Sequence, residues 1–549
     1  MQGLSRAAAV AALCSLSALA GTHLHGNGKA LSWKDGKVTL RVSRTVHWEG
    51  GDGTGVDRRE PASSAHAAIF EAIRSWERPG RGRIEIDLDF TDVQTVSAGE
   101  NVVTFTDPAP FDTGVCDKQR HISCTLISFT EDGGIASASV AFNPYKRHSS
   151  LGLAGTHDLG LIMMHEMGHV LGLNHSFTGG SVMLAEAESE PAEGSTPLFA
   201  LRRLSEDDLS TLALLYPKAG AARIAGTVRR EGEPLAAARV IALDAAGRIR
   251  YGSFSGEDGS FALAVVPGAG YRVAADPDDG PAAFAHVDEP IEVAGDASVE
   301  GVEITLAPPG PKPRVDSVGL VADGSYAGLP RVDLARGAAH AFALTHSPAG
   351  VPVELLFPRP AIVPEGEPSW PVNAPRLVRQ TIQVDPLAAP GDYALLFRSG
   401  DALGLLAGPL RIVTRPVVKS VEDAETGALA VEMTSGRRYR LRGEDLAETE
   451  AEALREFDGA PLPAQLNGVS VRLGERFLPL VSVGPAELLF EYPAGGVKES
   501  SAFLSVSSGT TTTSKPVLMH LAPAPEAAAA SARRQGADGA PLVRLSKKN

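Results

Sequence analysis

Residues 165–175 read HEMGHVLGLNH and carry the side chains best suited to chemistry. His165 and His169 are four residues apart, which places both imidazoles on one face of a helix. Two imidazoles in that position can bind one metal ion at Zn–N distances of about 2 Å. Gly172 tolerates a left-handed backbone, so the helix can end there and the chain can return His175 to the metal as a third ligand. Three protein ligands leave the fourth tetrahedral position to water, as in catalytic zinc sites.

Glu166 follows the first histidine directly and is predicted to hold the metal-bound water. The alternative is a buried helix whose histidines are hydrogen-bonded in the core without any metal. Three histidines and a glutamate packed in that way carry a large desolvation cost. The pattern therefore favours a metal site over a purely structural cluster.

The elements that must position these residues follow from the hydrophobic pattern of residues 31–217. Alternating apolar residues predict half-buried strands, and spacing at i, i+4 and i+7 predicts an amphipathic helix that contains Ile69, Ile73 and Trp76. A buried helix is expected over 159–171, and a closing helix begins at the N-cap Ser205. The expected strands are 38–42, 84–90, 101–106, 125–129 and 139–142.

The eleven residues 165–175 match HExxHxxGxxH, so the segment resembles the metzincin zinc-protease signature. Ser176 after the third histidine, together with residues 158–159 and 204–216, is similar to the matrixin branch of that family. The resemblance spans about 31–217 and implies an α/β (α+β) protease domain. We expect the rest of this multidomain chain to form all-β sandwich domains.

The resemblance also implies roles for individual residues. His165, His169 and His175 would bind one catalytic Zn²⁺, and Glu166 would activate the zinc-bound water as general base. Residues 181–183 read Ser-Val-Met, and Met183 fits the Met-turn below the zinc. An extended peptide substrate would pair with an edge strand beside the cleft, for which 139–142 is the candidate.

The sequence also departs from the matrixin pattern. Ala185 stands two residues after the turn methionine, where matrixins usually have proline, and the acidic stretch 186–197 would line the primed-side pocket. No cysteine lies between Gly21 and the first strand, so latency by a thiolate on zinc is unsupported. No calcium-binding motif supports a Ca²⁺ site. No second, structural zinc site is recognisable among the remaining histidines, of which the loosest candidates are His121, His148 and His157.

Residues 1–20 resemble a secretory signal peptide: Arg6 precedes an apolar run, and small residues end at Ala20, where cleavage is expected. Only Cys116 and Cys124 then remain, and in an oxidising compartment a disulfide between them is the favoured interpretation. A metal site formed by these cysteines with His121 is the alternative, but it lacks a fourth ligand at a sensible spacing.

After residue 220 the pattern changes to short alternating runs broken by turns, which is typical of β-sandwiches. Residues 221–308 are similar to carboxypeptidase regulatory-like domains, as in Gly226-Thr227-Val228 and Asp258-Gly259-Ser260-Phe261. A proline-rich linker precedes two β-rich segments, 314–416 and 417–521, which are expected to be Ig-like. The Ala-rich and then basic segment 522–549 is predicted to be a disordered tail.

The chain has 549 residues and a net charge of 51 − 66 = −15, which argues against nucleic-acid binding. Apart from the signal, no apolar run is long enough for a transmembrane anchor.

The leading hypothesis is a secreted, extracellular zinc endopeptidase that cleaves extracellular-matrix or other protein substrates. A surface adhesion or binding protein with an inert protease-like domain is the alternative, and a hydrolase of non-peptide bonds is a third. The β-sandwich modules could serve as spacers or as contacts to a cell surface or matrix.

Overall fold

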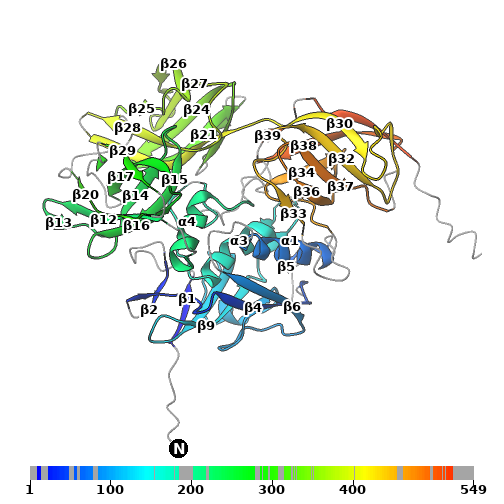
Figure 1. The fold of residues 1–549 in the computed structure, drawn as a ribbon, viewed down its shortest axis with the longest axis horizontal. Helices are drawn as coiled ribbons and strands as arrows, with labels where there is room; N and C mark the ends of the chain where they lie inside the picture. Colours follow the sequence, from blue (N-terminus) through cyan, green and yellow to red (C-terminus); the bar gives the residue numbers. More distant parts are fainter. Residues whose placement is uncertain are drawn as a thin grey trace, which may run out of the picture.

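The computed structural model describes residues 9–13 and 23–522, apart from gaps at 27, 48–54, 59–61, 78–83, 152, 154, 179, 185–201, 218–221, 278–284, 287–288, 295–296, 307–313, 323–324, 327, 329–330, 348, 350, 401, 454–461, 495–498, 510 and 514. The N-terminal α/β domain lies below three β-sandwiches in Figure 1. The predicted linker at 309–313, the acidic stretch at 186–197 and nearly all of the predicted tail fall outside the described residues.

A six-stranded mixed sheet forms the base of the N-terminal domain, with strand order β1-β8-β9-β7-β4-β6. The strands β6, β4, β7 and β9 pair in parallel, whereas β8 pairs antiparallel with both β9 and β1. Its strands are β1 (Ala9–Leu13), β4 (Lys37–Ser43), β6 (Glu85–Thr91), β7 (Val102–Thr104), β8 (Ser123–Phe129) and β9 (Ile135–Phe142). Short ladders join β2 (His25–Gly26) to β3 (Lys29–Ala30), and β5 (Gly55–Val56) to β10 (Arg147–Ser149) and β11 (His157–Asp158).

Two helices, α1 (Ala62–Arg74) and α3 (Leu159–Val170), pack against each other, and α3 also contacts β8 and β9. The short α2 (Ala109–Asp112) and the closing α4 (Glu206–Leu215) complete the domain. Alternate residues of β4, Val38, Leu40 and Val42, are buried in the core, as the period of two predicts. All of the helices and strands predicted for this domain are present, although α1 ends at Arg74 and leaves the predicted helix residue Trp76 in the following turn. β7 is shorter than expected, and β8 and β9 begin two and four residues earlier.

The prediction that 139–142 is an edge strand is wrong. These residues lie in β9, which is an interior strand between β8 and β7. Part of the predicted signal segment, β1, forms the outermost strand on that side and pairs with β8 from Ala9↔Phe129 to Leu13↔Thr125. The sequence pattern could not separate an edge strand from its neighbour, because both are short apolar runs in a sheet that is covered by helix α3.

The first sandwich packs two sheets around Tyr251, Leu263 and Val273. One sheet contains β12 (Ala222–Arg230), β13 (Glu233–Pro234), β16 (Ser260–Val265) and β20 (Val299–Leu306). The other contains β14 (Ala238–Leu243), β15 (Ile249–Phe254), β17 (Ala269–Pro277), β18 (Ala285–His286) and β19 (Ile291–Val293).

The second sandwich buries alternate residues of β28, Tyr393, Leu395 and Phe397, between its two sheets. One sheet contains β21 (Arg314–Ala322), β22 (Ser325–Tyr326), β24 (Ala339–Ser347), β26 (Ile362–Ser369) and β27 (Leu377–Val384). The other contains β23 (Val332–Ala335), β25 (Glu354–Leu356), β28 (Gly391–Ser399) and β29 (Ala402–Val413).

The third sandwich has its own core around Tyr439, Phe490 and Tyr492. One sheet contains β30 (Val417–Asp423), β32 (Arg438–Glu444), β33 (Ala451–Glu452), β36 (Leu480–Val483) and β37 (Glu487–Glu491). The other contains β31 (Glu432–Met433), β34 (Val469–Leu473), β35 (Arg476–Leu478), β38 (Ser501–Ser508), β39 (Thr511–Thr512) and β40 (Val517–Leu521).

The predicted fold class, an α/β domain followed by all-β sandwiches, is confirmed. The first sandwich lies beside α4, the second lies above the first, and the third lies above α1 and α3 (Figure 1). Within the described residues, no helix has the length and apolar character that a membrane span needs.

Candidate metal centre

Helix α3 presents His165 and His169 one turn apart, and its two ends are well defined. Asp158 caps the first turn by accepting a hydrogen bond from the Leu161 backbone amide at 2.9 Å. The helix ends at Val170, and Gly172 two residues later has a φ of +93°. A Cβ at this glycine would lie 2.1 Å from the Leu31 carbonyl oxygen, so both the backbone conformation and the space require glycine. The chain reverses at the predicted residue.

The reversal brings His175 back to the helix. The ring centroids of His165 and His169 are 4.8 Å apart, and that of His175 lies 5.2 Å and 4.9 Å from them. One potential ligand atom from each ring lies within 4.8 Å of the others. The structure therefore gathers the three histidines that the sequence pattern selected, from α3 and from the segment that follows it.

Hydrogen bonds determine which ring nitrogens face the centre of this cluster. His165 Nδ1 lies 2.8 Å from the Val182 carbonyl oxygen, and His169 Nδ1 lies 2.9 Å from the Leu173 carbonyl oxygen. Because a carbonyl oxygen can only accept, each Nδ1 carries the proton and each Nε2 has a lone pair. These two Nε2 atoms are 3.1 Å apart.

Two lone pairs at this separation repel each other unless a cation lies between them. Two nitrogen ligands of a tetrahedral zinc ion are separated by about 3.3 Å, given a Zn–N distance of about 2 Å. The donor set is therefore suited to a divalent metal, and the bonds from Nδ1 to backbone carbonyls are the usual second contacts of metal-binding histidines.

The protonation states also suit metal binding. Burial, and next to it the charge of a neighbouring histidine, lowers the pKa of all three imidazoles to about 3. The rings are therefore neutral at pH 7, and neutral imidazole is the form that binds a metal.

Glu166 lies on α3 between the two helix histidines and is buried. The hydroxyl of Ser123 donates to Glu166 Oε1, and the hydroxyl of Thr125 donates to Oε2. Both donors belong to β8 and lie two residues apart, so they point to the same face of the sheet. Each carboxylate oxygen is thus held by one hydroxyl from the strand beside the helix.

Met183 lies beneath the histidines, where a Met-turn residue is expected. A Cβ at Gly168 would lie 2.2 Å from the Met183 sulfur, so the side chain packs directly on the helix between its two histidines. The Met183 carbonyl accepts from the Ser176 amide at 2.8 Å, and the Asp208 carboxylate accepts from the Ser181 hydroxyl and the Val182 amide. The turn is therefore tied to the segment after His175 and to α4.

A disulfide joins Cys116 to Cys124, with an S–S distance of 2.02 Å. Both cysteines are fully buried. Cys124 lies in β8 between Ser123 and Thr125, so the disulfide anchors the strand that holds Glu166.

Among the described residues, none of the remaining candidate histidines belongs to a group of three potential metal ligands. His148 Nε2 lies 3.0 Å from the Asn143 carbonyl oxygen, and its ring centroid is 5.9 Å from that of His157. His121 Nδ1 accepts from the Asp117 amide at 2.8 Å. In the part of the chain that the structure describes, His165, His169 and His175 are the group whose ligand atoms converge.

Sequence reasoning missed the residues that support the site from a distance. Trp33 Nε1 donates to the Val170 carbonyl at 2.8 Å, and the Tyr216 hydroxyl donates to the Leu171 carbonyl at 2.7 Å, so both fix the end of α3. Asp207 accepts from the hydroxyls of Ser176 and Thr178 at 2.6 Å and 2.9 Å. No local pattern marks these partners, because each contact joins segments that are distant in sequence.

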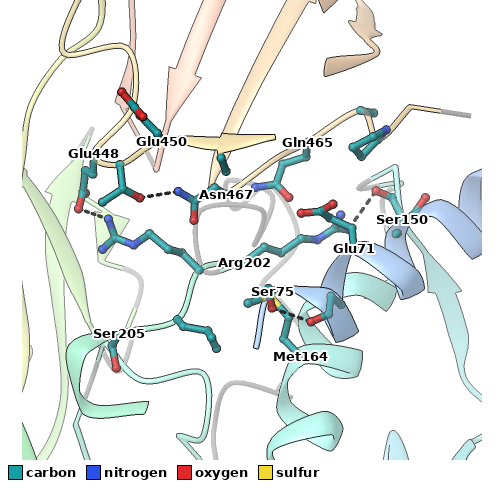
Figure 2. A pocket seen from close by; sticks show the side chains of 18 of the residues that line it. Glu71, Ser75, Ser150, Met164, Arg202, Ser205, Glu448, Glu450, Gln465 and Asn467 are labelled. Carbon is teal, nitrogen blue, oxygen red and sulfur yellow. Dashed lines mark hydrogen bonds and ion pairs between the residues drawn. The ribbon is translucent and has the colours of Figure 1, made fainter. Parts of the chain in front are cut away.

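A cavity of about 1270 Å³ lies at the junction of the N-terminal domain and the three sandwiches, and the histidine cluster does not line it. Figure 2 shows Glu71 and Met164 on the helix side, Arg202 in the middle, and Glu448 and Asn467 on the sandwich side. The cavity is a junction between domains, and its mixed charges do not define a ligand.

Comparisons with known proteins locate one family in the chain. The model of the matrixin family matches residues 55–217, a region that contains the three histidines and Glu166. No curated protein matches the chain.

Among solved structures, an I-band fragment of titin matches with 10% identity and a TM-score of 0.18, over 55% of this chain and 96% of that chain. The major pilin subunit BcpA of Bacillus cereus matches with 9% identity and a TM-score of 0.15, over 55% and 96%. A Bacteroides ovatus protein from a mixed-linkage glucan utilization locus matches with 11% identity and a TM-score of 0.17, over 54% and 66%. TM-scores this low support no conclusion about function.

Proposed function

We propose that this chain, whose residues 55–217 form a domain of the matrixin family, is a secreted zinc-dependent endopeptidase. The family supports metallopeptidase activity in general, and the identity of the metal, of the catalytic residue and of the substrate is our proposal. The observation that carries it is the pair of unprotonated Nε2 atoms of His165 and His169, 3.1 Å apart, with the His175 ring beside them.

His165, His169 and His175 would hold the zinc ion, which when bound would acidify a water molecule and polarise the substrate carbonyl. The hydrogen bonds from each Nδ1 to Val182 and Leu173 orient the first two rings before any metal arrives. This arrangement reduces the reorganisation that binding requires.

Glu166 would accept the proton of the attacking water and pass it to the leaving amine. Its carboxylate must be ionised for the first step, and two donated hydrogen bonds from Ser123 and Thr125 favour the charged form. The same hydroxyls hold both oxygens of the carboxylate in place, so the proton is taken up and released at a fixed position.

An extended protein substrate would add to the free edge of β8. This edge becomes available if residues 1–20 are removed as a signal peptide, because β1 belongs to that segment. Secretion also agrees with the buried Cys116–Cys124 disulfide, which is stable in an oxidising compartment.

The test is cleavage of casein by the purified chain, with its zinc content measured by elemental analysis. We expect one zinc per chain and cleavage that a chelator abolishes. The variant Glu166→Gln should retain zinc and lose about 10²–10⁴-fold in kcat, because general-base catalysis contributes that much. The control variant His169→Ala should lose the metal.

Normal cleavage by Glu166→Gln would refute the role of this residue. A wild-type chain that binds zinc and cleaves no protein would favour the alternative of an adhesion protein with an inert domain.

A further inference from the structure

Residues 175–184 carry the third histidine and the Met-turn, yet they are packed against domains that lie beyond the protease fold. We infer that the first and second sandwiches position His175 and Met183 and are therefore part of the catalytic unit rather than spacers. The inference rests on the proposed zinc function. Three separate contacts carry it, one at Phe177, one at Asp207 and one at Gly180.

Phe177, two residues after the third histidine, inserts its side chain between the two sandwiches. Its ring centroid lies 4.8 Å from that of Phe254 in β15, in an edge-to-face arrangement. It packs against a small apolar cluster formed by Ile241 and Ile249 of the first sandwich and Leu405 of the second. This packing holds the backbone two residues after His175 against both sandwiches.

Asp207 links the same segment to the first sandwich through hydrogen bonds. One of its oxygens accepts from Ser176 and Thr178, and the other accepts from the Gly252 backbone amide of β15 at 2.5 Å. The contact with Gly252 is tight: a Cβ there would lie 2.8 Å from Thr178 Cγ2 and 3.2 Å from the Phe177 ring. The first sandwich therefore approaches the zinc-ligand segment as closely as a glycine allows.

The second sandwich contacts the start of the Met-turn in a similar way. A Cβ at Gly180 would lie 2.2 Å from Asp392 Oδ2, and Asp392 is in β28. Gly180 is three residues before Met183, so both sandwiches contact the stretch that leads from His175 to the Met-turn.

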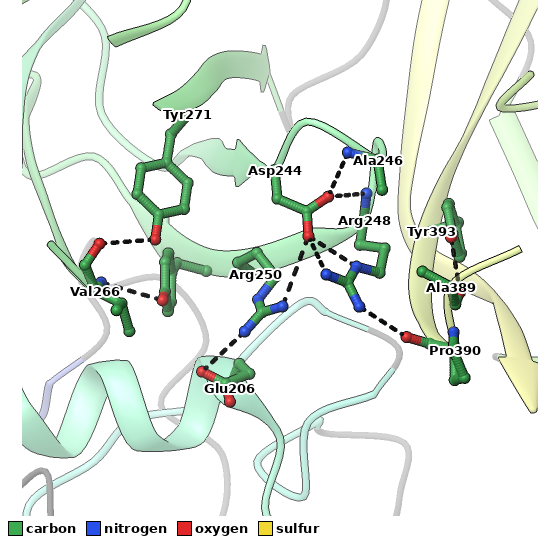
Figure 3. A network of polar contacts seen from close by, with 11 residues as sticks. Glu206, Asp244, Ala246, Arg248, Arg250, Val266, Tyr271, Ala389, Pro390 and Tyr393 are labelled. Carbon is green, nitrogen blue, oxygen red and sulfur yellow. Dashed lines mark hydrogen bonds and ion pairs between the residues drawn. The ribbon is translucent and has the colours of Figure 1, made fainter. Parts of the chain in front are cut away.

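A charged network keeps both sandwiches in place against α4. Figure 3 shows Asp244 between Arg248 and Arg250, with Arg250 directed towards Glu206 at the start of α4. Arg248 donates to Asp244 at 2.7 Å and to the Pro390 carbonyl of the second sandwich at 3.1 Å. The network joins three domains, so the contacts at Phe177 and Gly180 belong to one connected interface.

The consequence is that zinc affinity depends on residues of the sandwiches. His165 and His169 lie on α3, whereas His175 and the Val182 carbonyl that holds the His165 ring lie on the segment that the sandwiches contact. A change at Gly252, which is 77 residues from His175, should therefore weaken metal binding. Supporting residues behind metal ligands typically change affinity by about 10- to 100-fold.

The experiment compares full-length wild type with Phe177→Ala, Phe177→Leu and Gly252→Ala. The zinc dissociation constant is measured by competition with a chelating dye, and the visible spectrum of the Co²⁺ form reports the ligand geometry. The matched control is Gly484→Ala in the third sandwich, where an added Cβ meets its nearest atoms at an ordinary 3.4 Å. Thermal unfolding of each metal-free variant shows that it is folded.

We expect Phe177→Ala and Gly252→Ala to bind zinc about 10-fold or more weakly and to alter the Co²⁺ spectrum. Phe177→Leu should recover most of the affinity, and Gly484→Ala should match wild type. Folded variants with wild-type affinity and spectrum would overturn the inference. If wild type itself binds no zinc, the proposed function fails instead, so the two failures are distinct.

Discussion

At the scale of single residues, the hydroxyl pair around Glu166 is the most specific feature of the site. Ser123 and Thr125 each donate to one carboxylate oxygen, and all three side chains are buried. In a buried site such charge-assisted hydrogen bonds are stronger than neutral ones. If a donor is removed, nothing compensates the carboxylate for the water that it lost on burial. Ser123 and Thr125 are therefore positioning residues for the proposed general base.

The double variant Ser123→Ala/Thr125→Val should lower kcat by about 10-fold or more, because the carboxylate is no longer held in its reactive position. Zinc content should stay at the wild-type value, since both hydroxyls donate to the Glu166 carboxylate, which is not one of the three proposed ligands. The measurement is steady-state cleavage of a peptide substrate together with elemental analysis.

A matched control is Ser139→Ala in the neighbouring strand β9, where the hydroxyl donates to the Glu100 carbonyl at 2.7 Å. It should lose stability without loss of kcat. Equal kcat values for the double variant and wild type would exclude a positioning role.

At the scale of elements, α4 connects the Met-turn, the third-ligand segment and the first sandwich. Its N-cap Ser205 forms a reciprocal pair with Asp208, and that residue also accepts from Ser181 and Val182. Asp207 and Asp208 thus use the first turn of one helix to hold two other segments. Burial, and next to it the charge of Asp208, raises the pKa of Asp207 to about 7.

This raised pKa predicts how stability depends on pH. A carboxyl group with a pKa near 3.8 when unfolded and about 7 when folded stabilises the fold fully below pH 4. That contribution is lost as the pH rises from about 4 through 7, because the unfolded chain releases the proton over this range while the buried carboxyl retains it. Asp207→Asn removes this titrating carboxyl. The free energy of unfolding of the variant should therefore fall less than that of wild type between pH 4 and pH 8. Urea unfolding at several pH values measures this difference.

The exposed Asp258, whose pKa is lowered by hydrogen bonds from Ser260, provides the control. Asp258→Asn should keep the wild-type slope between pH 5 and pH 8. Parallel curves for wild type and Asp207→Asn over that interval would contradict the prediction.

At the scale of the whole molecule, Glu448 connects the third sandwich to two other parts of the chain. It accepts from Arg203, just before α4, and from Arg411 of the second sandwich at 2.7 Å. The Arg411 side chain is only 4% exposed, so its charge depends on this partner. A second link, between Arg336 and Asp445 at 3.3 Å, lies nearby.

Glu448→Gln should destabilise this junction by roughly 2 kcal/mol, the usual value for hydrogen bonds to charged groups. Calorimetry should then show the third sandwich unfolding in a separate transition at a lower temperature than the rest. Glu475→Gln is the matched control, because Glu475 is 98% exposed and pairs only on the surface with Arg472. An unchanged thermogram for Glu448→Gln would show that other contacts hold the sandwich.

Some residues of the site could be predicted from the sequence, and others could not. The three histidines, Glu166 and Gly172 were predictable because the 3.6-residue helical period and the conformational freedom of glycine act within eleven residues. Ser123 and Thr125 were not, because strand β8 reaches α3 only through the order of strands in the sheet. The choice of 139–142 as an edge strand failed for the same reason.

The amino-acid sequence by itself determined the α/β domain, the run of sandwich domains and the local donor set of the metal centre, since these depend on periodicity and spacing along the chain. Only the tertiary structure decided which strand holds Glu166, which domain confines Phe177 and Gly180, and where the four domains meet. Those contacts join residues that lie far apart in the chain, and no local preference specifies them. They arise when separately folded surfaces bury their apolar and charged side chains against one another.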